Sequence, residues 1–172
     1  MPPPASPSTP STPAVVVRRE PYDTEGSRWV VARAEEELVA RYGMLDDGEL
    51  GLTASMFDPP AGAFVVARVD GDGDAHPVGG AGVRTIAPGA GEVRRLWVDP
   101  AWRRRGIARA LMAGLEEAAR DLGLATLRLA TGDRQPEAVA LYDTTGWERV
   151  RVDTYEGPGE TVCVFRFVKS LG

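Results

Sequence analysis

Arginines gather in one short stretch of an otherwise acidic chain. Six of them lie between residues 94 and 109, where Asp99 is the single acid, while the whole chain carries a formal net charge of −5. The arginines at 103–105 directly precede Gly106 and the amphipathic run Ile107–Leu122. Unpaired backbone N–H groups and the positive end of the helix dipole favour anions at the start of a helix. The stretch therefore predicts a site for a phosphate-bearing ligand.

Two small residues strengthen this prediction. Gly106 and Ala108 lack the side chains that would hold a pyrophosphate away from the first backbone amides of the helix. The alternatives are simple helix packing for these residues, and a solvated basic surface or a nucleic-acid site for the arginines. The acidic balance of the whole chain argues against nucleic acid, because surfaces that bind it are usually strongly basic. We therefore expect no nucleic-acid partner.

Hydrophobic patterning predicts the elements that position this stretch. Apolar residues at three- and four-residue steps predict three helices, which are Asp23–Tyr42, Ile107–Leu122 and a helix that begins at Pro136 and ends before Gly146. The predicted strands are Val15–Val17, Ala63–Val69, Val78–Ile86, Glu92–Val98, Leu124–Ala130, Trp147–Val152 and Thr161–Val168. Residues 43–62 show no sustained period and predict a loop or a broken helix. This order predicts an α/β or α+β fold, a mixed sheet flanked by helices that contains an antiparallel meander.

Length and composition limit the organisation of the chain. The 172 residues, 43% of them hydrophobic, predict a single domain at 14–172 after a disordered Pro/Ser/Thr-rich tail at 1–13. One cysteine, Cys163, and one histidine, His76, exclude an internal disulfide and a structural zinc site, and we expect no metal. No apolar run is long enough for a membrane helix and no signal-peptide pattern is present, so we expect no membrane partner and a cytoplasmic location.

The arginine stretch resembles a known coenzyme signature. Arg103-x-x-Gly106-x-Ala108 is similar to the (Gln/Arg)-x-x-Gly-x-(Gly/Ala) motif with which GNAT acetyltransferases bind coenzyme A. A second block at 127–147, especially Gln135–Tyr142, resembles the same family. The resemblance spans nearly all of the chain after the tail. It implies a GNAT-like mixed, mostly antiparallel sheet flanked by helices, and the activity of an acetyl-CoA-dependent N-acetyltransferase.

The resemblance also implies a coenzyme site. Family members hold the pantetheine arm of acetyl-CoA against backbone amides of the third meander strand, which here belong to Leu96, Trp97 and Val98. The residues implied around the pyrophosphate are Arg103, Arg104, Arg105, Gly106, Ile107 and Ala108. Gln135 stands where the family often carries asparagine, and it is expected to reach the pantetheine or the neighbouring backbone.

The family reaction is a direct attack of a neutral amine on the thioester carbonyl, which needs a base, an oxyanion donor and an acid. The resemblance implies Tyr142 as the acid and the Val98 amide as the oxyanion donor; the alternative for Tyr142 is an aromatic ring packed on the sheet. Glu92 matches the position of a strand glutamate in some members, and burial is expected to raise its pKa toward that of a useful base. The alternatives for Glu92 are an ion pair with Arg94 and a proton path through water.

The acceptor amine stays open between a small molecule and a protein. Five acids favour a cationic acceptor by long-range attraction, and they are Asp46, Asp47, Glu49, Glu156 and Glu160. The alternative is a solvated acidic loop. The second functional class is a non-catalytic acyl-CoA-binding or sensor domain of the same fold. Exposed sheet edges leave a homodimer open.

Overall fold

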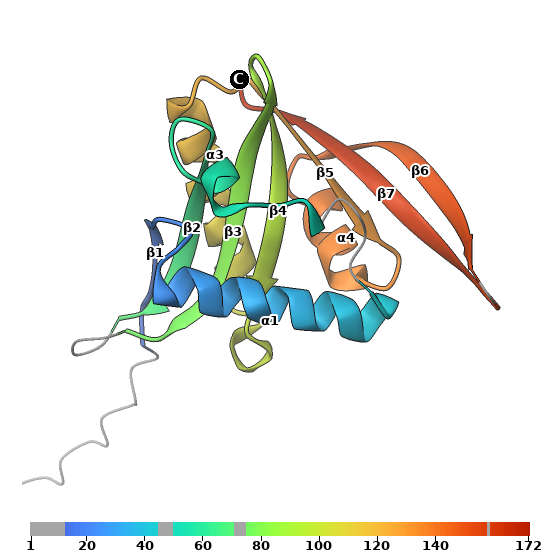
Figure 1. Cartoon of the computed structure of the whole chain (residues 1–172), viewed down its shortest axis with the longest axis horizontal. Helices are drawn as coiled ribbons and strands as arrows, with labels where there is room; N and C mark the ends of the chain where they lie inside the picture. Colours follow the sequence, from blue (N-terminus) through green and yellow to red (C-terminus); the bar gives the residue numbers. More distant parts are fainter. Residues whose placement is uncertain (1–12, 45–49, 71–74, 158) are drawn as a thin grey trace, which may run out of the picture.

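A computed structural model describes residues 13–44, 50–70, 75–157 and 159–172. Within these ranges seven strands form one sheet in the order β1-β2-β3-β4-β5-β7-β6. Neighbouring strands pair antiparallel except β4 and β5, which run parallel. Helix α1 crosses one face of the sheet and α3 covers the opposite face, while β6 and β7 extend away from the rest as a long arm (Figure 1). The expected mixed, mostly antiparallel sheet flanked by helices is confirmed.

The elements have the following bounds. The helices are α1 (Glu25–Tyr42), α3 (Ile107–Asp121) and α4 (Pro136–Asp143), with short 3-10 helices η1 (Ala54–Phe57) and η2 (Pro100–Trp102). The strands are β1 (Val15–Arg19), β2 (Gly62–Val69), β3 (Pro77–Ala87), β4 (Ala90–Val98), β5 (Thr126–Gly132), β6 (Glu148–Gly157) and β7 (Glu160–Ser170).

Helix α1 is fixed at both ends by local chemistry. The side chain of Thr24 accepts a hydrogen bond from the backbone N–H of Ser27 at 3.1 Å, which satisfies one of the unpaired donors of the first turn. Gly43 ends the helix in the left-handed conformation at φ 81°, where glycine carries no Cβ penalty. Val30 and Ala34 lie buried against the sheet. The predicted helix and its glycine stop are confirmed.

Helix α3 supplies the main core on the other face of the sheet. Leu111 and Leu115 are fully buried against apolar residues of strands β2 to β5. Burial of a leucine side chain contributes roughly 1.5–3 kcal/mol, so this stripe anchors the loop that precedes the helix. Gly123, at φ 76°, follows the last turn as the sequence predicted.

Strands β4 and β5 pair over only a short length. Their register runs from Ala90↔Thr126 to Glu92↔Arg128 and then stops. Farther along, β4 contains a bulge in which Arg95 and Leu96 lie opposite the single residue Ala81 of β3, and Arg95 adopts a φ of 61°. The two strands therefore diverge, and one backbone edge of each faces open space between them.

The structure extends several predicted elements. Strand β6 continues to Gly157, although the pattern predicted an end at Val152, because it pairs with β7 along its whole length while most of its side chains are exposed. An apolar pattern cannot mark a strand whose faces are not buried. Part of the segment 43–62 forms η1, whose Phe57 is fully buried. Asp46, Asp47 and Glu49, and residues 1–12 of the predicted tail, lie outside the described residues.

Candidate active site

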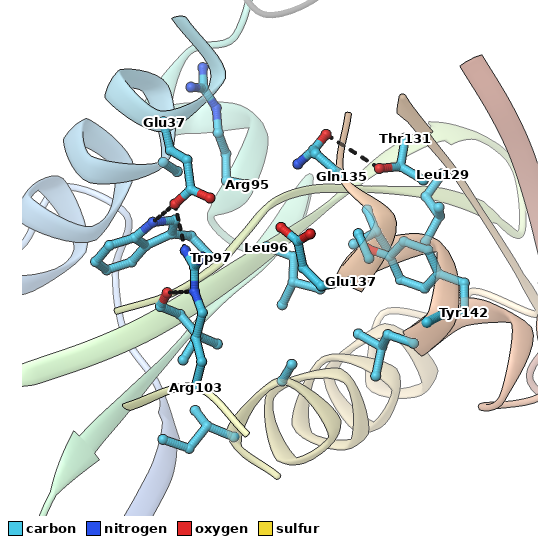
Figure 2. Close-up of a pocket in the computed structure, with 18 of the residues that line it drawn as sticks. Glu37, Arg95, Leu96, Trp97, Arg103, Leu129, Thr131, Gln135, Glu137 and Tyr142 are labelled. Atoms are coloured by element: carbon cyan, nitrogen blue, oxygen red, sulfur yellow. Dashed lines mark hydrogen bonds and ion pairs between the residues drawn. The ribbon is translucent and has the colours of Figure 1, made fainter. Parts of the chain in front are cut away.

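The divergence of β4 and β5 opens a cleft of about 880 Å³. Its walls are Val93–Val98 of β4 and Leu129–Thr131 of β5. Residues of α1 close one side, and the loop before α3 together with α4 closes the other (Figure 2). Because the strands do not pair here, alternate backbone N–H and C=O groups along the inner edges lack a strand partner. An extended ligand arm can supply those partners.

The loop before α3 has the shape of an anion site. Asp99 caps η2 by accepting the N–H of Ala101 at 2.8 Å, and the chain then passes through left-handed conformations at Arg104 (φ 62°) and Gly106 (φ 78°). A Cβ at Gly106 would meet no atom within 4 Å, so the space over the first turn of α3 is open. Successive N–H groups at such a turn form a concave surface that attracts phosphate. Arg104, Gly106, Ile107 and Ala108 all line the cleft.

Arg103 and Arg105 take different positions from each other. The guanidinium of Arg103 donates to the carbonyl of Val98 at 2.9 Å and to Glu37 at 2.5 Å, so this side chain ties the loop to β4 and α1 (Figure 2). Arg105 lies 4.7 Å above the ring centroid of Trp102 and is absent from the lining of the cleft. The structure thus brings Arg103 into the cleft wall and turns Arg105 away from it.

Glu37 is the central polar group on the α1 side. It accepts hydrogen bonds from Trp97 Nε1 at 2.8 Å, from Arg103 and from Arg41 at 2.5 Å. Arg41 also pairs with Glu137 of α4 at 2.5 Å. Burial alone raises the pKa of Glu37, but the hydrogen bonds from Arg103 and Trp97 outweigh it and leave the pKa below its ordinary value. The carboxylate is therefore ionised and holds three elements together.

Tyr142 lies in the opposite wall, on α4 (Figure 2). Its side chain is buried, with 5% of its surface exposed, and its ring packs against Trp147 and Phe167 at centroid distances of 5.7 and 5.4 Å. Burial raises the pKa of the phenol well above its ordinary value, so the hydroxyl keeps its proton. The ring therefore packs on the sheet, and because the same residue also lines the cleft, its role as the acid stays a prediction.

Gln135 is the N-cap residue of α4 and lines the cleft, and its contact with the pantetheine arm stays a prediction. Its Oε1 atom accepts a hydrogen bond from the hydroxyl of Thr131 at 3.3 Å and lies 3.5 Å from the hydroxyl of Tyr42. These contacts fix the side-chain carbonyl within the protein. The amide NH2 group remains as the part of Gln135 that can face a ligand.

Glu92 does not line the cleft. Its carboxylate pairs with Arg84 at 2.7 Å and with Arg94 at 3.3 Å. Burial alone raises its pKa, but the hydrogen bond from Arg84 and the charge of Arg94 outweigh that effect, and the pKa lies below its ordinary value. The expectation of a raised pKa is wrong, and the alternative of an ion pair with Arg94 is confirmed.

The part of the cleft that helix α1 lines was not predicted from the sequence. Ala34, Glu37, Leu38 and Arg41 line the cleft from this helix, and they follow one another at steps of three, one and three residues. The signal was present in the sequence, because Glu37 and Arg41 fall on the same helical stripe as the apolar residues that face the sheet. A charged pair on a core-facing stripe indicates a polar site.

The site residues fit a coenzyme A thioester. An unpaired strand edge suits the amide-rich pantetheine arm, and the left-handed loop before α3 suits its pyrophosphate. Among the described residues no group of three or more His, Cys, Asp or Glu side chains is placed to hold a metal ion. Within the same ranges no helix is long and apolar enough to cross a membrane. The fold and the cleft define an acyltransferase that takes its acyl group from coenzyme A.

Comparison with known proteins identifies the family. The model of the Acetyltransferase (GNAT) family matches residues 31–147. The chain therefore belongs to the GNAT family and is an acetyl-CoA-dependent N-acetyltransferase, and the resemblance noted in the sequence is confirmed.

Relatives agree with this assignment. The chain is similar to the uncharacterised N-acetyltransferase YjgM of Escherichia coli K12, with 27% identity over 82% of this chain and 87% of the relative. It is 40% identical to the IAA acetyltransferase of Azospirillum brasilense over 49% of this chain and 53% of the relative. Its fold resembles that of a GNAT acetyltransferase from Staphylococcus aureus Mu50, with a TM-score of 0.71 at 14% identity, covering 92% of this chain and 100% of that one.

Proposed function

We propose that the protein transfers the acetyl group of acetyl-CoA to a primary amine by direct attack, with both substrates bound at once. The unpaired edge of β4 at Leu96, Trp97 and Val98 supports this proposal, because it can hydrogen-bond the pantetheine arm. In this arrangement the Val98 amide donates to the developing oxyanion. The loop and first helical turn at 103–108 also support the proposal, because their open backbone N–H groups can bind the pyrophosphate. Arg103 acts there by holding the loop in place.

The reaction makes a C–N bond and breaks a C–S bond. The neutral amine attacks the thioester carbonyl carbon, the nitrogen loses a proton, and the thiolate leaves with the electron pair of the C–S bond. Tyr142 gives its proton to the thiolate and is reprotonated from solvent, a role supported by its position in the cleft wall. The adjoining wall excludes water from the thioester, because Leu96 and Leu129 are apolar.

We further propose that water, rather than Glu92, removes the proton of the acceptor ammonium. Glu92 is outside the cleft lining, and its lowered pKa makes it a weaker base than an ordinary carboxylate. The test is the pH dependence of kcat/KM in Glu92→Gln. An acid limb that persists unchanged supports the water path; loss of that limb would assign the proton transfer to Glu92.

One observation carries the proposed function: the divergence of β4 and β5 directly beside the left-handed loop, with Tyr142 in the wall. The test is release of free thiol from acetyl-CoA with a panel of primary amines, together with mass detection of the acetylated product. We expect amine-dependent thiol release. Normal acetyl-CoA binding with no product from any amine would indicate the non-catalytic sensor instead.

A further inference from the structure

The cleft opens onto a basic surface on the α1 face of the sheet. Arg94 of β4 and Ala130 of β5 line the cleft from this face, where the two strands begin to diverge. Ala130 lies directly opposite Arg166 of β7, and Arg128 lies two residues before Ala130 on the same face of β5. Ala130 and Arg128 are both exposed. A small residue at the mouth of the cleft is therefore flanked by three arginines.

The core packing under α3 shows which face of the sheet carries these arginines. Leu127 and Leu129 of β5 belong to the core under α3, and so does Phe167 of β7. Side chains alternate between the two faces of a strand, so Arg128 and Arg166 point away from that core. Arg94 follows the same rule, because its neighbour Val93 is buried in the α3 core. All three arginines consequently share the α1 face.

In the described part of this surface, arginines outnumber carboxylates. The carboxylates near its centre are each shared between two arginines, Glu92 between Arg84 and Arg94 and Asp153 between Arg151 and Arg166. Among the described residues Arg128 makes no ion pair or hydrogen bond. Glu148 stands in the same row of the sheet, but Val168 of β7 separates it from Arg128. Within the ranges that the structure describes, Arg128 therefore has no carboxylate of its own, because Glu92, which lies opposite it in the register, is held by Arg84 and Arg94.

We propose that Arg128, flanked by Arg94 and Arg166, binds a carboxylate on the acceptor, so that the acceptor is an amine of the free amino acid class. This inference rests on the proposed acetyl transfer and names its substrate. A guanidinium matches a carboxylate with two parallel hydrogen bonds, which makes arginine well suited to this recognition. Arg128 and Ala130 are about 7 Å apart along β5, so the amine in the cleft and the carboxylate on Arg128 belong to one small molecule.

This acceptor differs from the one expected on sequence grounds. Glu156 and Glu160 lie near the exposed end of the β6–β7 arm, where Glu156 accepts a hydrogen bond from Thr161 and Glu160 pairs with Arg134. They carry partners of their own. Among the described residues, Arg94 lines the cleft on this face, and Arg128 and Arg166 lie beside Ala130. Their charge favours an anionic group next to the reacting amine.

The test compares matched acceptors. Each amino acid is assayed beside its amide and its decarboxylated amine, for example phenylalanine, phenylalaninamide and phenethylamine, by thiol release from acetyl-CoA. We expect the wild type to prefer the carboxylate form. Arg128→Gln should raise KM for that form about ten- to hundredfold, leave kcat nearly unchanged and leave KM for the amide unchanged. Arg128→Glu should reverse the preference toward the uncharged forms.

Arg149→Gln is the matched control, because Arg149 lies on the opposite face of the sheet, 4.5 Å above the ring centroid of Phe165. It should keep the wild-type preference. Equal turnover of acids and amides by the wild type overturns the inference and leaves the proposed function standing. A carboxylate preference that survives Arg128→Glu overturns the assigned site, as does acetylation confined to proteins. Absence of turnover with every amine overturns the proposed function and this inference with it.

Discussion

Arg103 of the coenzyme loop and Glu37 of helix α1 form an ion pair at 2.5 Å, although 66 residues separate them in the chain. The contact places a charged residue of the motif against an element that the motif does not include. It fixes the end of β4 as well, because Arg103 also donates to the carbonyl of Val98. The signature arginine therefore stabilises the shape of the loop, while the backbone N–H groups stay available for phosphate.

Glu37→Gln removes the charge of this contact with little change of size. We expect the free energy of unfolding to fall by about 1–2 kcal/mol, because hydrogen bonds to a charged, partly buried group are lost. We expect the affinity for acetyl-CoA to fall about five- to tenfold, because the loop is less firmly held. Urea unfolding and calorimetric titration measure the two effects. The control is Glu36→Gln, on the exposed side of the same helix. Tighter coenzyme binding by Glu37→Gln would contradict this account and show that Glu37 competes with phosphate.

The lowered pKa of Glu37 predicts an acid-sensitive fold. Burial raises this pKa, the hydrogen bonds from Arg103 and Trp97 lower it by more, and the net value lies below that of the unfolded chain. A group of this kind contributes stability above its unfolded pKa and loses it as the pH falls through the folded one. Thermal unfolding followed from neutral pH to below about pH 4 should show the wild type losing more stability than Glu37→Gln. Parallel curves for the two proteins would contradict the assignment.

Tyr142→Phe separates the packing and the chemistry of this residue. Phenylalanine keeps the ring contacts with Trp147 and Phe167, so stability and acetyl-CoA affinity should stay close to those of the wild type. Loss of the acid should lower kcat about a hundredfold. Steady-state kinetics measure this change in kcat, and Tyr155→Phe on the exposed strand β6 is the matched control. An unchanged kcat would leave Tyr142 with a packing role alone.

The parts of the site that depend on residues close together in the chain could be predicted from the sequence. The arginines, Gly106 and the stripe of Ile107, Leu111 and Leu115 share one local pattern, so the loop, α3 and its stop were predicted together. The second block gave α4 with Tyr142 for the same reason. Each of these features depends on residues within a few turns of one another.

The rest depends on contacts between distant segments. The bulge at Arg95 arises from pairing with Ala81 of β3, and the side chain of Arg95 is held by Glu35 of α1 at 2.6 Å. The lowered pKa of Glu92 comes first from Arg84, on a neighbouring strand, and then from Arg94 on its own strand. No periodicity in a single segment carries that information, so the bulge and the charge state of Glu92 required the assembled sheet. The residues of α1 that line the cleft differ in this respect, because their charged pair lies on one helical stripe.

The most direct test of the coenzyme cleft is calorimetric titration of acetyl-CoA into the wild type, Gly106→Glu and Gly123→Glu. Both glycines adopt a left-handed φ, 78° and 76°, and a Cβ at either position meets no atom within 4 Å, so the two substitutions carry the same backbone strain at opposite ends of α3. We predict micromolar binding by the wild type and by Gly123→Glu. We predict no measurable binding by Gly106→Glu, because its carboxylate would occupy the proposed pyrophosphate site. Equal binding by Gly106→Glu and Gly123→Glu, or no binding by the wild type, would contradict the placement of coenzyme A in this cleft.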